Sequence, residues 1–432
     1  MVVSTKKTLF RFQNKLSNRF LQNLAWLGGS QMLNRVVRLG TTATIARLLS
    51  PTDYGLAAVV LTAHEFINVF TRGGIVTKLI QAPESELEAC NETAYWLNWI
   101  LCGSLFVLQC VVAFPVSEFY GNRAIALPLI VMAFIYLMLP FACVQAALNI
   151  RENRLRVAAT ADSLQFISDC ALTVIFALLG FGAWAIVLPK VLVAPIWVVI
   201  NRENHSWRPS GKLTLTKTRE IMQFGRHILG VELLSTARNH ADYLLIGRFL
   251  GLEALGVYYF AFNAGLGISL SLIGAFNSAL FPWLCAVNQD LDQLEKRFLQ
   301  GLKTLSLIAV PIILLQCVSA PVYVPLVFGE KWIAAGALPV LIIICLSALP
   351  RPFAEAASQL TRALDQPRFD SQWNIIFTGI LLMALLIGVQ SGLLGVAIAL
   401  LIAHLIAMPI FTLWTTRHLR RTRLASKLLS AL

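Results

Sequence analysis

Charge is what this 432-residue sequence has least of, because only 13% of its residues are Asp, Glu, Lys or Arg. A typical soluble domain carries about 25% charged residues, so roughly half of the usual charge is missing. Hydrophobic residues make up 57% of the chain and gather in long runs, such as 124–149, 166–200, 333–350 and 375–413. A helix needs about 20 apolar residues to cross a bilayer. The composition excludes an ordinary soluble protein and indicates a membrane protein.

The apolar runs also lack the alternating pattern of barrel strands. In lipid, only helices and closed barrels satisfy their own backbone groups, and barrel strands alternate over about ten residues. These runs are longer and continuously apolar, which predicts an all-α polytopic membrane protein of about twelve helices. The expected spans are 22–46, 53–71, 94–114, 124–149, 158–179, 182–201, 222–247, 252–283, 303–320, 333–350, 371–389 and 392–415.

Motifs for catalysis and metal binding are missing as well. The eight cysteines form no CxxC pair, the six histidines show no HExxH spacing, and the chain has no Walker A motif. Asp290 and Asp292 form a DxD motif of the kind that glycosyltransferases use. However, Asp290 also fits a helix cap, with Gln293 three residues further on. We therefore predict a transporter rather than an enzyme, with no cofactor other than H⁺ or Na⁺ as a coupling ion.

The positive charges lie mostly on one side of this layout. If the N-terminus is cytoplasmic, most of the 35 Lys and Arg residues fall in cytoplasmic segments, as the positive-inside rule requires. We therefore expect an inner-membrane protein with both termini in the cytoplasm. The net charge of +13 then favours anionic membrane lipids over nucleic acid as the partner. The Lys and Arg residues on the opposite side are Arg47, Arg123, Arg248 and Lys331.

The sequence repeats itself about 201 positions apart. ARLLSPTDYGLAAVV at 46–60 shares its skeleton with GRFLGLEALGVYYFA at 247–261, and Gly55 pairs with Gly256. FYGNR at 119–123 similarly resembles VFGEK at 327–331. Parallel repeats of this kind are a transporter architecture. We expect five parts: a basic amphipathic lead-in (1–21), a six-helix bundle (22–201), a basic linker (202–221), a second bundle (222–415) and a basic tail (416–432).

Three ordered motifs resemble those of the polysaccharide transporter, or oligosaccharide flippase, family. They are ARLLSPTDYGLAAV, IGRFLGLEALGVYYFA and the VFGEKW that precedes the tenth expected span. That family belongs to an exporter superfamily with the multidrug exporters and the lipid II flippase, and the resemblance covers nearly the whole chain. It implies two bundles in a V-shape with a central cavity. It also implies alternating access that moves undecaprenyl-pyrophosphate-linked sugar units outward.

The first expected span carries a polar stripe. Arg35 and Arg38 share one helix face with Gln31 and Asn34. A charge at the bilayer centre costs about 3 kcal/mol on insertion scales, so it usually faces protein or water. Guanidinium groups suit a pyrophosphate or an acidic sugar, because they form bidentate pairs with phosphate oxygens. We predict that these residues line a substrate cavity. The alternative is that the arginines pair with acids on neighbouring helices.

The seventh span carries a matching stripe at the repeat position. Arg238 and Asn239 are further candidates for substrate binding, and Arg238 could equally form a salt bridge with Glu232 or Asp242. Each carboxylate within a span could also couple transport to a cation. For Asp169 we favour a pair with Lys190, because both lie at a similar depth. The candidates for coupling or a structural ion pair are Asp169, Lys190, Glu232, Asp242, Asp162 and Glu65.

The function predicted from these features is the flipping of lipid-linked oligosaccharide units for O-antigen, capsule or exopolysaccharide synthesis. A cation-coupled multidrug exporter of the same superfamily is the main alternative, and it would favour acids over arginines in the cavity. A membrane-embedded polysaccharide polymerase or ligase fits less well, because the expected outer loops are short. The polymerase and the chain-length proteins of polysaccharide assembly are candidate partners.

Overall fold

The computed structural model describes residue 29 and residues 31–72, 74–287 and 290–431, and every regular element in these ranges is helical. The chain divides into two compact units. Within the described residues, unit 1 comprises those up to Leu48 together with Ala63–Leu233, and unit 2 comprises Leu49–Thr62 and everything from Leu234 onward. The chain therefore passes from one unit to the other inside two of its helices. The all-α membrane fold that the sequence predicted is confirmed, whereas the amphipathic lead-in lies outside the described residues.

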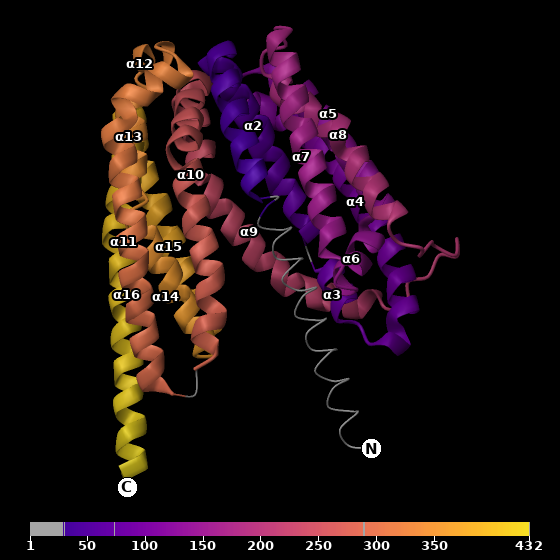
Figure 1. The fold of residues 1–432 in the computed structure, drawn as a ribbon. Helices are drawn as coiled ribbons and strands as arrows, with labels where there is room; N and C mark the ends of the chain where they lie inside the picture. The colour runs from indigo at the N-terminus through magenta and orange to yellow at the C-terminus, as the bar shows by residue number, and fades with distance from the viewer. Residues whose placement is uncertain (1–28, 30, 73, 288–289, 432) are drawn as a thin grey trace. The chain divides into compact units, whose positions relative to one another are not determined.

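Unit 1 is built on antiparallel neighbours that are joined by short connections (Figure 1). The closest packing pairs α7 with α8, α4 with α5, and α5 with α8. Its helices are an unlabelled helix over 31–48, the second part of α2 (Pro51–Asn68), α3 (Ile75–Gln81), α4 (Leu87–Phe119), α5 (Ala126–Met138), α6 (Cys143–Arg151), α7 (Leu155–Leu178), α8 (Trp184–Glu203) and the first part of α9 (Thr218–Phe249).

Unit 2 packs around a core of aliphatic and aromatic side chains from α10, α11, α14 and α16. Leu280, Phe298, Leu360 and Phe411 are buried members of this core. Its helices are the first part of α2, the second part of α9, α10 (Gly251–Cys285), α11 (Leu291–Tyr323), α12 (Lys331–Ala334), α13 (Ala337–Ser347), α14 (Arg351–Ala363), α15 (Pro367–Gly388) and α16 (Gly392–Ala431). Short 3₁₀ segments and one π segment lie between the helices, at Val69–Arg72, Glu84–Glu86, Arg123–Ile125, Leu139–Phe141, Val324–Phe328 and Val389–Ser391.

Two helix starts follow directly from their local sequence. Ser50 precedes α2, where its hydroxyl accepts from the Asp53 amide while Asp53 accepts from the Ser50 amide and hydroxyl. This reciprocal arrangement is a capping box. At α11, the side chain of Asp290 accepts from the amides of Asp292 and Gln293. The cap that the sequence predicted at Asp290 is therefore confirmed, and the DxD motif is a helix start.

The repeated glycines Gly55 and Gly256 meet where α2 crosses α10 inside unit 2. A Cβ on Gly55 would lie 1.8 Å from the Leu252 carbonyl oxygen, and a Cβ on Gly256 would lie 1.7 Å from that of Pro51. The contact is reciprocal, because each glycine rests on the carbonyl four residues before the other. Only glycine permits two helix backbones to approach so closely. This single close contact between α2 and α10 therefore explains why both repeated stretches of sequence carry a glycine at the matching position.

Eight helices within the described residues are long and apolar enough to cross a membrane. One of these stretches, Arg368–Leu424, covers two of the expected spans, and the total of twelve remains a prediction.

Two expected spans differ from the structure. The run 124–149 is divided at Leu139–Phe141, where Pro140 interrupts the backbone hydrogen bonds. The span over 333–350 was ended too early, because α14 follows it and completes the candidate span Ala337–Ala363.

Candidate membrane-embedded polar sites

The polar stripe of the helix over 31–48 faces α7 in unit 1. Asn34 donates to the Ser163 hydroxyl over 3.4 Å, and the Arg38 guanidinium carbon lies 5.0 Å from the centre of the Phe166 ring. The side chains of Arg38 and Gln31 are exposed, while those of Asn34 and Arg35 are partly buried. The described partner of Arg38 is thus an aromatic ring rather than a carboxylate, which leaves its N–H groups available to an anion.

Asp169 and Lys190 form an ion pair between α7 and α8. The Lys190 ammonium lies 3.1 Å from Asp169 Oδ2, and the Asp169 side chain is only 16% exposed. The two residues therefore meet as their depth in the sequence layout suggested. About two turns before Asp169, Asp162 is hydrogen-bonded to Trp197 of α8. Both acids of α7 thus lie against α8.

Arg72 brings together two acids that the sequence analysis had considered separately. Its guanidinium lies 2.5 Å from Glu65 of α2 and 3.8 Å from Glu232 of α9, all within unit 1. Arg72 therefore holds one carboxylate from each of the two helices, α2 and α9, within which the chain changes unit.

In unit 2 Arg238 begins a chain of polar contacts through the helices. It donates to the side-chain oxygen of Asn374 on α15, and Asn374 in turn donates to Asp370 over 3.3 Å. Asp370 is 8% exposed and also accepts from Ser358 over 2.6 Å and from Arg362 over 3.2 Å. The path from α9 to α14 therefore runs through a neutral amide and one buried carboxylate.

The other candidates of α9 lie in different surroundings. Asp242 is buried and accepts from the Tyr258 hydroxyl over 2.8 Å and from the Tyr243 amide over 2.9 Å. Asn239 is exposed. The structure thus gives Arg238, Asp242 and Glu232 separate partners, on α15, on α10 and in the 3₁₀ segment Val69–Arg72.

Sequence reasoning missed the polar face of α14. Arg351, Glu355, Ser358 and Arg362 recur every three or four residues and so share one face of the helix. Glu355 accepts from Asn277 of α10 over 2.6 Å. The helical spacing was visible in the sequence, but the low hydropathy of this segment made it look like a loop. No cluster of three metal-ligating side chains occurs among the described residues.

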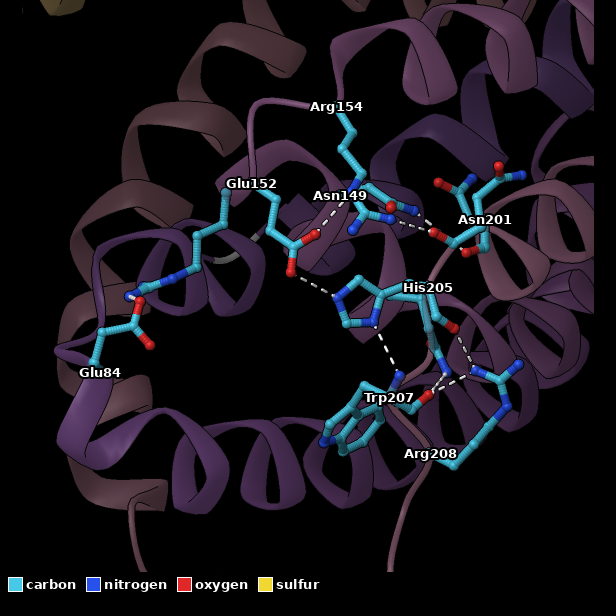
Figure 2. A network of polar contacts seen from close by, with 11 residues as sticks. Glu84, Asn149, Glu152, Arg154, Asn201, His205, Trp207 and Arg208 are labelled. Carbon is cyan, nitrogen blue, oxygen red and sulfur yellow. Dashed lines mark hydrogen bonds and ion pairs between the residues drawn. The ribbon is translucent and has the colours of Figure 1, made fainter. Parts of the chain in front are cut away.

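A second polar network fixes the connecting segment, residues 204–217, to unit 1. Figure 2 shows its centre, where His205 lies between Glu152 and Trp207. His205 Nδ1 accepts from the Trp207 amide over 3.0 Å, so its Nε2 carries the proton that faces Glu152 at 3.2 Å. Arg208 donates to the carbonyls of His205 and Trp207. The connection between α8 and α9 is therefore a docked segment rather than a loose linker.

The far end of the connecting segment rests on α4. Trp96 donates to the Lys212 carbonyl over 2.7 Å, and Lys217 lies 3.0 Å from Glu86 and 3.1 Å from Glu220. Hydrogen bonds to Glu86 and Glu220 raise the pKa of Lys217 above its ordinary value. The same contact with Lys217 lowers the pKa of Glu220. These charges stabilise the junction between the segment and α9.

Comparison with known proteins bears on the resemblance seen in the motifs. Residues 44–337 match the family described as polysaccharide biosynthesis protein. One relative is the lipopolysaccharide biosynthesis protein WzxC of Escherichia coli (strain K12). It is 25% identical over 378 residues, which cover 84% of this chain and 74% of the relative. The family suggested by the sequence motifs is confirmed.

Two solved structures share the fold. The lipid II flippase MurJ in an inward closed conformation superimposes with a TM-score of 0.74 at 12% identity, covering 90% of this chain and 87% of MurJ. A multidrug resistance transporter of the MATE family in an inward-facing conformation gives a TM-score of 0.72 at 15% identity, covering 93% and 99%. At such identities the likeness concerns the fold alone, and it connects this chain to transporter architecture.

Proposed function

The chain belongs to the polysaccharide biosynthesis protein family, and from this premise we propose that it is a flippase for lipid-linked oligosaccharide repeat units. It moves undecaprenyl-pyrophosphate-linked units from the cytoplasmic to the outer leaflet of the inner membrane by alternating access. The units serve the synthesis of a surface polysaccharide. Both termini lie in the cytoplasm in this proposal, and the bundles 22–201 and 222–415 are the two halves of the transporter.

The observation that carries the proposal is the environment of Arg38. Its side chain is exposed on the polar stripe of the helix over 31–48, and its described partner is the Phe166 ring. A cation at membrane depth is costly unless it faces protein, water or a ligand. The aromatic ring holds the guanidinium in place without using its hydrogen-bond donors. Arg38 is therefore suited to the pyrophosphate of a lipid-linked sugar, with Arg35, Asn34 and Gln31 beside it.

Arg238 and Asn239 belong to the same proposal as binding residues of unit 2. Asn239 is exposed, and Arg238 donates to Asn374 with one of its guanidinium nitrogens. Asp169 and Lys190 serve as a structural pair. The polymerase and chain-length proteins of polysaccharide assembly are the partners to which the product passes, and anionic lipids surround the basic cytoplasmic side.

The test is flipping of a fluorescent undecaprenyl-pyrophosphate oligosaccharide in proteoliposomes. We expect Arg38→Ala to lower the rate about tenfold, since a hydrogen bond to a charged group contributes about 1.5–3 kcal/mol. Arg38→Lys keeps the charge and should lose less, and Arg123→Ala, at an exposed site, is the matched control. Equal rates for Arg38→Ala and the wild type would remove Arg38 from the site.

The multidrug exporter is the second candidate, because the MATE fold matches the chain as well as the flippase fold does. It predicts cation-driven export of organic dyes and no flipping of the lipid-linked sugar. Measuring dye export in the same proteoliposomes separates the two. Dye export without flipping would overturn the flippase proposal.

A further inference from the structure

Glu355 of α14 occupies an unusual place for a carboxylate. It lies inside the candidate span Ala337–Ala363, and its side chain is exposed on unit 2. Its described hydrogen bond comes from a neutral amide, Asn277 Nδ2, at 2.6 Å. A carboxylate at membrane depth usually marks a pathway or a proton relay. Glu355 is therefore a carboxylate whose direct partner does not neutralise its charge.

The amide beside it is only half satisfied. Asn277 is 4% exposed, and within the described part of the chain its Oδ1 has no hydrogen-bond donor. A buried acceptor without a donor is unfavourable. The group that could supply a donor is Glu355 itself, since Asn277 Nδ2 already holds one of its oxygens. Oδ1 could then accept from the other oxygen if that oxygen carried a proton.

We propose that Glu355 and Asn277 form a proton-binding site that couples transport to a proton gradient. In the ionised state Asn277 Nδ2 donates to Glu355 Oε2. A proton taken from water forms an O–H bond at Oε1, and this O–H donates to Asn277 Oδ1. The acid and the amide are then joined by two hydrogen bonds, and both groups are satisfied. Release of the proton to water restores the single bond and the negative charge.

The charged groups around Glu355 favour a reversible site. Arg351 on the same helix and Arg238 of α9 act on Glu355 without direct contact. Asp370 of α15 is already held by Arg362 and Ser358. Apolar side chains of α11 cover the opposite face of α14. Two further titratable groups lie near these arginines. His404 of α16 donates from Nδ1 to the Leu400 carbonyl, and Asp242 accepts from the Tyr258 hydroxyl. Among the described residues no ion pair holds the exposed Glu355 carboxylate, so it can exchange a proton with water.

This inference rests on the proposed transport function for its coupling role but not for the proton site itself. The first test therefore needs no substrate. Infrared difference spectra of the purified protein in lipid, taken between neutral and acidic pH, should show the C=O band of a protonated carboxyl. The band should be lost in Glu355→Gln. In Asn277→Leu it should move to higher frequency, because the C=O no longer accepts from Nδ2.

Glu355→Gln is an informative variant because glutamine has the same shape as the protonated acid and also offers one acceptor and a donor. Its carbonyl can accept from Asn277 Nδ2 and its NH₂ can donate to Oδ1, so the fold is retained. The matched control is Glu118→Gln, at an exposed carboxylate of α4 in unit 1. The control should leave the infrared band of Glu355 unchanged. A band that persists in Glu355→Gln would overturn the proton site.

The second test measures flipping in proteoliposomes with and without a pH gradient. We expect the stimulation of flipping by the pH gradient to be at least fivefold smaller in Glu355→Gln than in the wild type. In Glu118→Gln the stimulation should equal that of the wild type. If the stimulation follows a sodium gradient instead, the pair binds a metal cation and the proton proposal is wrong. If the wild type flips nothing, the proposed function fails, and the infrared result still decides whether Glu355 binds a proton.

Discussion

The two units use arginine in contrasting ways. In unit 1, Arg151 donates to the carbonyls of Leu79, Ile80 and Ala82 at the end of α3 and also meets Glu84. In unit 2, Arg238 and Arg362 meet side chains in the interior of the helices, at Asn374 and Asp370. The same planar fork of donors therefore ties down a helix end at Arg151 and links helices at Arg238 and Arg362. The comparison teaches that an arginine near a loop can also stabilise the end of a helix.

The largest effect should come from breaking the network of unit 2. Asp370→Ala removes the acceptor of Ser358, Arg362 and Asn374. The half-exposed Arg362 can turn to water, but the side chains of Ser358 and Asn374 lose their acceptor, and a buried polar group left without its partner costs about 1–3 kcal/mol. We expect a large fall in the unfolding temperature of the protein in detergent. Asp365→Asn, at an exposed position with φ 57° that asparagine accepts readily, is the control. Similar unfolding temperatures for both variants would remove Asp370 from its central role.

A smaller effect should come from unit 1. Arg151→Met keeps most of the apolar stem but loses the donors to three carbonyls and to Glu84. Net losses of this kind amount to about 1.5–3 kcal/mol. Hydrogen exchange should become faster near residues 79–84, while the rest of the unit stays protected. Arg202→Met, at an exposed position, serves for comparison. Uniformly faster exchange across unit 1 would mean that Arg151 holds more than the end of α3.

The smallest effect concerns the junction of Lys217 and Glu220. The pKa of Glu220 is lowered in the folded state, so its contribution is present above its unfolded pKa and is lost as the pH falls through the folded one. The pKa of Lys217 is raised, so its contribution is lost only as the pH rises through that raised value. Since both groups are close to solvent, salt screens them.

The measurement is the unfolding temperature across pH at low and high salt. At low salt we expect a slight decrease on acidification that Lys217→Met removes, and at high salt we expect none. A large decrease that persists at high salt would show that these charges are more buried than their surroundings indicate.

Local features of the fold were predictable from the sequence. The caps at Ser50 and Asp290 depend on residues three positions apart, and the long apolar runs define most helices. The Asp169–Lys190 pair could be expected because both residues are a similar number of positions from one hairpin. Such contacts are set by spacing along the chain, so the sequence alone carries them.

Contacts between distant helices could not be predicted in this way. Arg72 meets Glu232 because the end of α2 and α9 approach each other, which no spacing reveals. The face of α14 was overlooked because its charges lowered the hydropathy by which spans are recognised. That face would have been found by its helical period instead. The binding roles of Arg35, Arg38 and Arg238 remain predictions that the flipping assay addresses.

The crossing of Gly55 and Gly256 has a consequence for the record of substitutions in related chains. Each added Cβ would strike a backbone carbonyl rather than a side chain, so no change at the opposite position could relieve the clash. A contact that cannot be compensated leaves no paired substitutions. Methods that infer proximity from co-varying positions should therefore fail to detect this contact between α2 and α10. Both glycines should instead be nearly invariant, each independently of the other.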